Sequence, residues 1–162
     1  MSLWDIHRTQ TALLSLLDPL DSLDVSASLL RMREDGGKLP RWPLANVYTG
    51  CMVGSHGIQV ISDAASKGLL SPTMVSEACV VAAEAADGQA RAGGANSYAS
   101  LGYVASDVSG RGAAVTLDYA YDDAAASWLC ALANDSTNAT RLQVRSGNFK
   151  NVFAYSMLLD ES

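Results

Sequence analysis

Apolar side chains recur every three or four residues along most of this chain, which is the spacing of one face of an α-helix. Six such stripes predict six helices, and proline, glycine or small polar residues mark their expected ends. The helices are expected from about Trp4 to Asp18, ended by Pro19; from Asp21 or Ser22 to Gly36-Gly37; from about Ile58 to Lys67-Gly68; from Ser71-Pro72 to Gly88; over about 117–132; and from Ser136 or Thr137 toward Asn151.

These elements predict an all-α fold built from antiparallel αα-hairpins. The connections between the predicted helices are alternately short and long, which suits helices that pack as stacked pairs. Small Ala, Gly and Ser residues on several faces allow the helices to approach closely, as in a helical toroid. The connection from Gly88 to Gly112 is long and rich in glycine and serine, and it is predicted to be a functional loop.

The segment over 37–54 is too rich in glycine and proline for a helix or a central strand, and too apolar for an ordinary surface loop. Pro40 and Pro43 fix φ on both sides of Arg41 and Trp42, and each proline disfavours helix just before it. A rigid loop that presents an aromatic face and a guanidinium suits the recognition of a sugar. The same residues suit a buried structural crossover between two helices equally well.

Composition narrows the classes of function. The 162 residues suffice for one domain with a sizeable core, and 49% of them are apolar, so the chain is not globally disordered. A net charge of −6 with scattered basic residues argues against a nucleic-acid partner. No stretch reaches about 18 apolar residues, so no membrane span is expected. The first residues also lack the basic and apolar regions of a signal peptide.

The three cysteines are Cys51, Cys79 and Cys130, and all lie far apart in apolar surroundings. An odd number of isolated cysteines favours small core residues over a disulfide or a set of metal ligands. No group of Cys and His residues has the spacing of a metal site either, so no metal is predicted from the residues alone.

Seven blocks of sequence carry a resemblance to a known family. They are Trp4-Asp5-x-x-Arg8; Gly37-x-Leu39-Pro40-x-Trp42; Cys51-Met52-x-Gly54-x-His56; Ile61-x-Asp63-Ala64-x-x-Lys67-Gly68; Gly102-Tyr103-Val104; Thr116-Leu117-Asp118-Tyr119-Ala120-Tyr121-Asp122-Asp123, the most specific; and Arg145-Ser146-x-Asn148-Phe149-Lys150-Asn151-Val152-Phe153. In this order they resemble glycoside hydrolase family 92, the exo-acting α-mannosidases. The resemblance implies that residues 1–162 form a single partial domain, about half of an (α/α)6 barrel, without the family's N-terminal β-sandwich domain and without the C-terminal half of the barrel.

The resemblance also implies an activity and its requirements. It implies hydrolysis of terminal α-linked mannose, with mannose-containing glycans as partners, by an inverting and calcium-dependent mechanism. The motifs that hold calcium and supply the general base in the family are not found in this chain, so no calcium ligand is expected among its residues. A secreted or periplasmic parent protein is a further implication of the resemblance.

One position departs from the family's pattern. Family members carry Asn-Glu-Thr just before the Cys-Met pair, and that Glu is the general acid, whereas this chain has Val47-Tyr48-Thr49. A phenol with a pKa near ~10 is a poorer proton donor than a carboxyl group tuned to about 6. The departure implies either an impaired enzyme or a leaving group that needs little protonation, such as a phosphate. An inverting glycosidase needs two carboxyl groups, so no catalytic residue is assigned here, and Tyr48 simply marks the acid position.

The resemblance implies a set of substrate-binding residues: Trp4, Asp5, Arg8, Arg41, Trp42, His56, Asp122 and Asp123. Several have a plainer interpretation. Asp5 and Arg8 would equally suit an ordinary i,i+3 pair at a helix start, and His56 would equally suit a bond to a loop carbonyl.

Four further residues have expected positions. Asp122 and Asp123 are not both expected to face solvent; one is expected to face the barrel interior and the other to make a capping or interhelical bond. His7 is expected on a helix surface and Trp128 in the core.

Two classes of function remain. The first is a fragment or degenerate member of an α-mannosidase catalytic domain, favoured by the blocks around Asp5, Arg41-Trp42 and Asp122-Asp123. The second is a non-catalytic helical module that binds carbohydrate or protein, favoured by Tyr48. A half-barrel would leave apolar faces exposed at its open edge and would self-associate through them. The residues expected there are Leu13, Leu14 and Leu17 near the start and Leu142, Val152 and Phe153 near the end.

Overall fold

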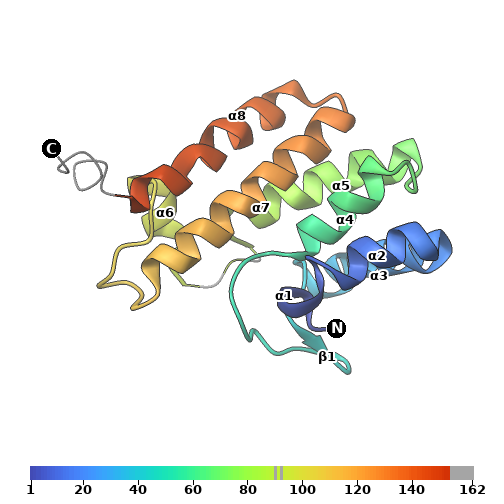
Figure 1. Cartoon of the computed structure of the whole chain (residues 1–162), viewed down its shortest axis with the longest axis horizontal. Coiled ribbons are helices and arrows are strands. Elements are labelled where there is room, and N and C mark those ends of the chain that lie inside the picture. The colour runs from blue at the N-terminus through green and yellow to red at the C-terminus, as the bar shows by residue number, and fades with distance from the viewer. Residues whose placement is uncertain (90, 92, 154–162) are drawn as a thin grey trace, which may run out of the picture.

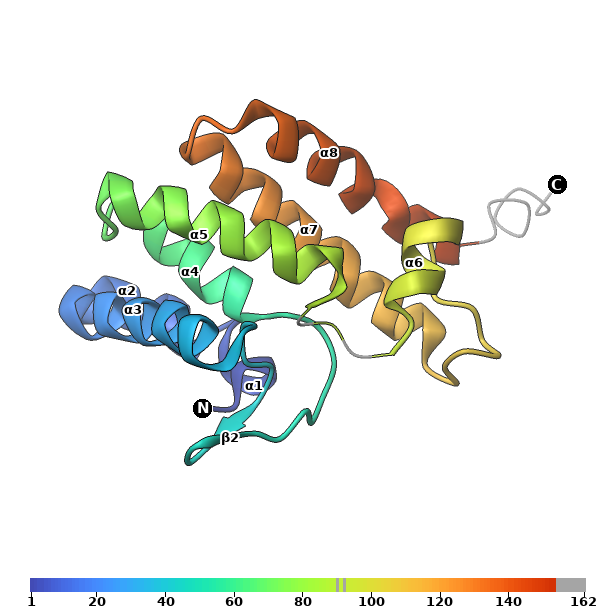
Figure 2. The ribbon, with the colours of Figure 1, turned by 180° about the vertical axis from the view of Figure 1, so that it is seen from behind.

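The computed structural model describes residues 1–89, 91 and 93–153, and most of them are helical (Figures 1 and 2). The α-helices are α1 (Leu3–Ile6), α2 (Gln10–Leu17), α3 (Pro19–Gly36), α4 (Gly57–Ser66), α5 (Pro72–Glu84), α6 (Ala95–Leu101), α7 (Gly112–Leu132) and α8 (Ser136–Ser146). A π-helical turn, η1 (Ala85–Gln89), follows α5, and a 3-10 helix, η2 (Gly147–Val152), follows α8. Two short strands, β1 (Pro43–Leu44) and β2 (Val47–Tyr48), pair in antiparallel register.

The predicted all-α fold of antiparallel hairpins is confirmed. Helices α2 and α3, α4 and α5, and α7 and α8 form successive pairs, and the pairs lie side by side (Figure 1). Helix α7 lies at the centre, because it contacts α8, α4 and α5. The main core lies between these pairs and includes Leu29, Ile58, Ile61, Leu129 and Leu142. No helix in the described part of the chain is long and apolar enough to cross a membrane.

The chain around Pro19 differs from the prediction. The first predicted helix is interrupted, since α1 ends at Ile6 and α2 begins at Gln10. Pro19 then opens α3 rather than only ending the helix before it, and the carboxylate of Asp18 accepts a hydrogen bond from the backbone N–H of Asp21. Proline is favoured at the first helical position because its missing N–H has no partner there. Asp18 therefore caps α3, and the cap expected at Asp21 or Ser22 was placed about one turn too late.

The other helix ends lie close to the predicted ones, except that α7 begins at Gly112, more than one turn before the expected start. Gly37 has a φ of +76° and ends α3, as glycine does where the backbone turns left-handed. Ser71 caps α5 by accepting a hydrogen bond from the backbone N–H of Met74, with Pro72 in the first turn. Asp135 caps α8, one residue before the expected start. The predicted loop over 88–112 contains the short helix α6.

The long connection between α3 and α4 combines the two alternatives considered for it. Leu39 and Pro40 near its start are buried, which suits a structural crossover. Its tip is the small hairpin of β1 and β2, where Leu44 and Val47 are exposed. Figure 1 shows this hairpin standing away from the helices.

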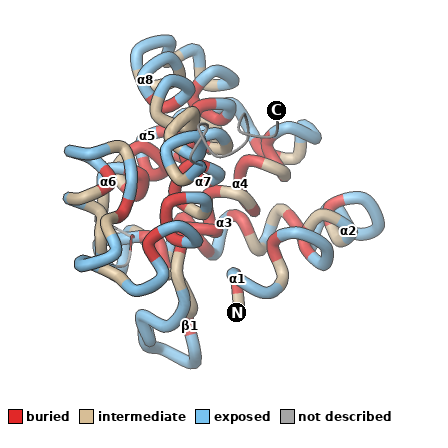
Figure 3. The backbone as a smooth tube through the Cα atoms, turned by 60° about the vertical axis from the view of Figure 1, so that its left-hand side comes forward, coloured by how far each residue is buried: buried red, intermediate tan, exposed pale blue. Residues whose placement is uncertain are grey.

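Helix α2 has an inverted pattern of burial. Its polar Thr11 and Ser15 are buried, whereas Leu13, Leu16 and Leu17 are between 55% and 75% exposed (Figure 3). We call these three leucines the leucine face of α2. The buried hydroxyl of Ser15 donates a hydrogen bond to Asp63 of α4, which accounts for the side of α2 that turns inward.

The expected open edge is only partly as predicted. Leu14 and Val152 are half-buried, and Phe153 is exposed. Leu142 is completely buried, so the expectation that it would be exposed is wrong. It belongs to the main core, because α8 packs along α7 with this side chain turned inward.

Cys79 and Cys130 form a disulfide, which corrects the expectation of isolated core thiols. The bond joins α5 to α7, and the two Cα atoms lie 4.7 Å apart. Both cysteines are buried, as expected of core residues, but Cys51 is exposed and has a free thiol. A separation of 51 residues concealed the pair, because only the packing of α5 against α7 brings them together.

The disulfide is expected to stabilise the fold substantially. Replacing Cys79 with Ala should lower the free energy of unfolding by about 2–4 kcal/mol, because the bond closes a long loop in the unfolded chain. Urea unfolding under non-reducing conditions measures the change. The matched control, Cys51→Ala, should leave stability unchanged. An unfolding midpoint of the original chain that does not respond to reductant would contradict the prediction.

Candidate functional site

Four side chains form a histidine–aspartate cluster: His7 just after α1, His56 just before α4, and Asp118 and Asp122 of α7. The imidazole Nδ1 of His56 lies 2.9 Å from a carboxylate oxygen of Asp122, and its Nε2 lies 4.0 Å from Asp118. The ring of His56 stacks on the ring of His7 with centroids 4.0 Å apart. Since an ionised carboxylate can only accept, Nδ1 of His56 is the donor to Asp122.

The backbone before α4 explains why His56 reaches α7. Gly54 has a φ of +74°, and a Cβ atom at this position would lie 2.5 Å from the ring of His56. Glycine is therefore required by both the backbone and the packing. The next residue, Ser55, donates its backbone N–H to Asp122 at 2.5 Å, so the carboxylate holds the start of α4 through two contacts.

His7 is buried against His56, and the expectation of a surface position is wrong. Its Nδ1 donates to the carbonyl oxygens of Leu3 and Trp4, both at 3.0 Å, because the chain turns sharply after α1. Burial lowers the pKa of His7 below its usual 6.5, and the neighbouring His56 lowers it further. Its Nε2 has no hydrogen-bond partner among the described residues.

Asp118 lies at the more open side of the cluster, with its side chain 17% exposed. Burial raises the pKa of this carboxyl group, and the nearby charge of Asp122 adds to the effect. The opposing contributions come from His56, from a hydrogen bond with the side chain of Trp4 and from the charge of Arg8. A partly exposed carboxyl group with a raised pKa beside an arginine and a tryptophan is typical of a functional site.

A cleft of about 530 Å³ opens beside the cluster between α2, α4 and α7. The residues that line it are His7, Arg8, Ala12, Gln59, Ser62, Asp63, Ser66, Tyr121, Ala124, Ala125 and Trp128. The guanidinium of Arg8 lies 5.0 Å above the ring of Tyr121. Trp128 is 57% exposed on the wall of the cleft and donates from Nε1 to Ser66 at 2.8 Å, so its expected core position is wrong. The cleft thus offers aromatic faces and polar groups together.

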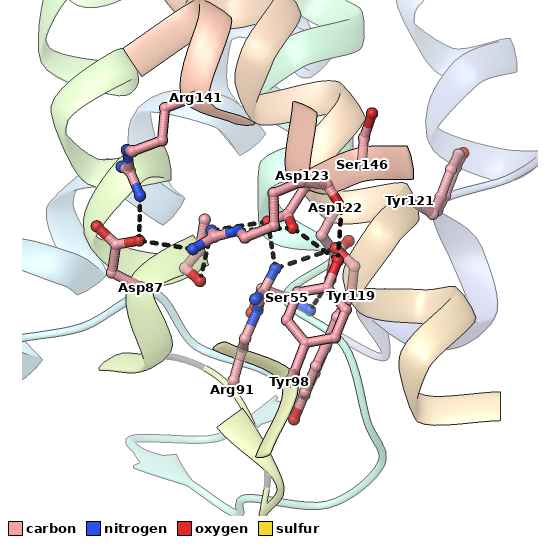
Figure 4. A network of polar contacts seen from close by, with 12 residues as sticks. Ser55, Asp87, Arg91, Tyr98, Tyr119, Tyr121, Asp122, Asp123, Arg141 and Ser146 are labelled. Carbon is pink, nitrogen blue, oxygen red and sulfur yellow. Dashed lines mark hydrogen bonds and ion pairs between the residues drawn. The ribbon is translucent and has the colours of Figure 1, made fainter. Parts of the chain in front are cut away.

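Asp123, the next residue of α7, makes a second set of polar contacts (Figure 4). Its carboxylate accepts from Arg91 at 2.5 Å, from the Tyr98 hydroxyl at 2.9 Å and from Arg145 at 2.8 Å. Consecutive residues of a helix point about 100° apart, which explains why Asp122 and Asp123 serve different networks. Both are completely buried, so the expectation that they would not both face solvent is confirmed.

Arg41 and Trp42 of the 37–54 segment make hydrogen bonds that hold this segment in place. Arg41 donates from Nε to the carbonyl oxygen of Cys51 at 3.0 Å and from Nη2 to that of Gly50. Trp42 donates from its indole to the hydroxyl of Ser2 at 2.6 Å, and this hydroxyl donates in turn to Asp5. Trp42 and Asp5 are therefore linked through one serine.

Tyr48, which the resemblance implies to stand at the acid position, points back toward α3. Its hydroxyl donates to the carbonyl oxygen of Met32, and a Cβ atom at Gly36 would overlap its ring. Burial raises the pKa of Tyr48, and the charge of Asp35 raises it further. Both effects make this phenol a weaker acid than an exposed tyrosine.

The structure gathers some of the predicted site residues and separates others. Trp4 and Arg8 adjoin the histidine–aspartate cluster, which contains His56 and Asp122. Asp5 and Trp42 both form a hydrogen bond with the hydroxyl of Ser2. Arg41 instead donates to Gly50, and Asp123 accepts from Arg91. His56, Asp122 and Asp123 are buried and paired within the protein, so their contact with a sugar stays a prediction.

Three residues of the site were not among the predicted set: His7, Asp118 and Tyr121. Asp118 and Tyr121 could have been predicted from the Thr116–Asp123 block, because Asp118 lies one turn before Asp122 and Tyr121 lies one residue before it.

Comparison with known proteins gives a consistent result. The profile of the glycosyl hydrolase family 92 catalytic domain matches residues 1–158. A family 92 α-mannosidase from Bacteroides thetaiotaomicron, solved with mannoimidazole, is similar to this chain with a TM-score of 0.84 and 23% identity, over 94% of this chain and 20% of the solved one. A family 92 inverting mannosidase from B. thetaiotaomicron VPI-5482 is similar with a TM-score of 0.80 and 25% identity, over 95% and 21%. No curated protein matches the sequence.

The buried position of His7 is expected to make stability depend on pH. The unfolded chain takes up a proton at His7 near pH 6.5, whereas the folded chain does so only at lower pH. The unfolded state therefore binds more protons in this window, and the free energy of unfolding falls as pH is lowered from about 7 to 6, by at most about 1.4 kcal/mol per unit.

Urea unfolding of the original chain and of His7→Gln across this range tests the effect. Glutamine can keep a hydrogen bond to the carbonyl of Leu3, and both proteins retain His56, Arg8, Asp118 and Asp122, so the difference in slope isolates His7. Equal slopes in the two proteins would show that His7 does not contribute.

Proposed function

The chain belongs to glycosyl hydrolase family 92, and we propose that it is a part of an α-mannosidase that contributes residues for binding terminal α-linked mannose of glycans. Its fold is that of an α-mannosidase-like glycosidase, and it spans about a fifth of the length of the solved mannosidases that it resembles. Hydrolysis of the glycan belongs to the proposed whole enzyme.

The observation that supports this proposal is that Arg8 lines the cleft and interacts with Asp118, whose carboxyl group also hydrogen-bonds the side chain of Trp4. Sugar sites combine an aromatic face with directed hydrogen-bond donors and acceptors. Trp4 supplies such a face, Arg8 supplies donors, and the carboxylate of Asp118 supplies acceptors. The other members of the cluster, His7, His56 and Asp122, are buried, so we assign them the role of positioning Asp118 and the start of α4.

The resemblance to inverting mannosidases suggests inversion for the whole enzyme, with two carboxyl groups on opposite sides of the glycosidic bond. Tyr48 does not provide the first of these groups, because its pKa is raised and its hydroxyl is already bonded to Met32. This observation favours the second candidate function, a carbohydrate-binding module that has lost catalysis.

Calcium is proposed only for the whole enzyme. The described residues offer no site that suits it, because Ca²⁺ takes six to eight oxygen ligands. Cys79, Cys130 and Asp135 are the described residues that group three potential metal ligands, and two of them are joined as a disulfide. Calcium therefore takes no part in the roles proposed for the residues of this chain.

The disulfide also bears on the compartment of the parent protein. Disulfides persist mainly in oxidising environments outside the cytosol. The bond between Cys79 and Cys130 thus supports the secreted or periplasmic location that the family resemblance implies.

We expect the chain to bind α-mannosides without hydrolysing them. Loss of general acid–base assistance costs roughly 10²–10⁴-fold in rate for each group, so an aryl α-mannoside should show no measurable turnover with or without calcium. Binding of methyl α-mannoside, measured by calorimetry, should weaken at least about 10-fold in Asp118→Asn, because a charged hydrogen-bond acceptor is lost.

The control for this experiment is Asp107→Asn, which changes an exposed aspartate in the loop before α7 and should leave binding unchanged. Equal affinities in the Asp118 and Asp107 variants would remove Asp118 from the site. Calcium-dependent release of the aryl group by the purified chain would overturn the proposed loss of catalysis.

The leucine face of α2 is expected to drive self-association. Three adjacent leucines, with Leu20 of α3 beside them in sequence and 74% exposed, form an apolar surface that is unusual on a soluble monomer. Light scattering of the chain should show oligomers, and Leu16→Glu with Leu17→Glu should shift them toward monomer. Val144→Glu, on the exposed side of α8, is the control. A compact monomer that binds no apolar dye would argue against an open barrel edge.

A further inference from the structure

Two tripeptides of the chain have the form Asn-x-Ser/Thr, which is the acceptor sequence for N-linked glycans. They are Asn134-Asp135-Ser136, where α7 is joined to α8, and Asn138-Ala139-Thr140, within α8. So short a motif arises often by chance, and the surroundings of each asparagine determine whether it can carry a glycan. The two asparagines lie close together in the sequence, yet their surroundings differ.

The backbone of the turn fixes the position of Asn134. Its φ is +60°, in the left-handed region that asparagine tolerates better than most residues. The backbone N–H of Asn134 donates to the carbonyl oxygen of Ala131, and that of Asp135 donates to the carbonyl oxygen of Cys130. These two bonds are the Schellman arrangement at a helix C-terminus. Since Cys130 is also held by the disulfide, the turn is anchored firmly to α7.

The two side chains that the acceptor sequence requires at this turn are accessible. Asn134 and Ser136 are exposed, and their side chains make no hydrogen bond within the part of the chain that the structure describes. Asp135 between them is engaged elsewhere, because its carboxylate accepts from the backbone N–H of Asn138 at 3.0 Å and caps α8. The amide nitrogen that would receive a sugar and the neighbouring hydroxyl are therefore both available.

Asn138, the asparagine of the second tripeptide, is already engaged within the protein. It is half-buried in α8, its Nδ2 donates to the carboxylate of Asp135 at 2.7 Å, and its Oδ1 accepts from Arg141 at 2.9 Å. A sugar on this nitrogen would crowd the carboxylate that caps α8. A half-buried amide has little room for so bulky a group, so the structure favours Asn134 over Asn138 as the acceptor.

A cavity of about 360 Å³ lies beside Asn134, between the turn from α4 to α5 and the turn from α7 to α8. Figures 1 and 2 show these two turns at the same end of the helix pairs. The lining is mostly apolar and consists of Ala65, Leu70, Pro72, Val75, Ser76, Leu132, Ala133 and Asn134. Burial of apolar surface is favourable, so the C–H groups of a first sugar on Asn134 have a surface on which to pack.

We propose that Asn134 carries an N-linked oligosaccharide. The donor is a lipid-linked oligosaccharide diphosphate. Transfer forms a bond between Nδ2 of Asn134 and C1 of the first sugar, breaks the bond between that carbon and the diphosphate, and releases the lipid diphosphate and one amide proton. The disulfide between Cys79 and Cys130 suits the oxidising secretory compartment in which such transfer takes place. The proposal goes beyond the proposed mannoside binding and uses none of its residues.

Secretion of the full chain from cultured insect cells, behind a cleavable signal peptide, tests the proposal. Intact mass spectrometry of the secreted chain should show one oligosaccharide, which peptide N-glycosidase removes. Asn134→Gln should abolish this loss of mass on digestion completely, because the acceptor amide is gone. The matched control is Asn138→Gln, which disables the other tripeptide and should leave the loss of mass unchanged.

A second pair of variants leaves the left-handed turn residue in place, in case Asn134→Gln is not secreted. Ser136→Ala removes the required hydroxyl and should also abolish the glycan, whereas Ser136→Thr keeps a hydroxyl and should retain it. An original chain whose mass does not change on digestion would overturn the proposal. So would a glycan that persists in Asn134→Gln or Ser136→Ala. The readout is mass alone, so a failure of mannoside binding would leave this proposal standing.

Discussion

Two adjacent carboxylates in the middle of α7 constrain the rest of this structure. Asp122 and Asp123 are completely buried, and an unpaired buried charge costs several kcal/mol. Each must therefore be surrounded by donors, and the donors come from other parts of the chain. Asp122 takes them from Ser55 and His56 at the start of α4, and Asp123 takes them from Arg91, Tyr98 and Arg145. One dipeptide thus ties α7 to α4, to the segment around α6 and to α8.

The same helix also places the candidate sugar site. Asp118 lies one turn before Asp122, and Tyr121 and Trp128 lie on the side of α7 that faces the cleft. Because His56 is held by Asp122 and stacks on His7, the turn after α1 is fixed relative to α7. Trp4 and Arg8 flank that turn, so the buried histidines and the groups proposed to bind the sugar form one unit. The aromatic and polar lining of the cleft follows from this packing.

The apolar surface that the chain exposes bears on the proposal that it is part of a larger enzyme. The family match covers residues 1–158, yet the chain spans only about a fifth of the solved mannosidases. The exposed leucine face of α2 suits the proposal that the chain is part of a larger barrel, since a helix in a closed barrel buries its apolar side. Tyr48, which the resemblance implies to stand at the acid position, packs against Gly36 and donates its hydroxyl to the carbonyl oxygen of Met32.

The helices and most of their ends were predictable from the sequence alone. Helical spacing, Pro72 after a capping serine and Gly37 at a left-handed turn act within a few residues, so the all-α fold and most helix ends followed directly. The family blocks similarly indicated Trp4, Arg8, His56 and Asp122, which the structure brings close together.

Contacts between distant residues were decided only by the tertiary structure. The disulfide between Cys79 and Cys130, the stacking of His7 on His56 and the exposure of Trp128 depend on how helices pack. Periodicity gives the apolar side of a helix but not which neighbour covers it. The leucine stripe of α2 therefore predicted the helix correctly, while only the packing of Ser15 against Asp63 determined that the leucines face outward.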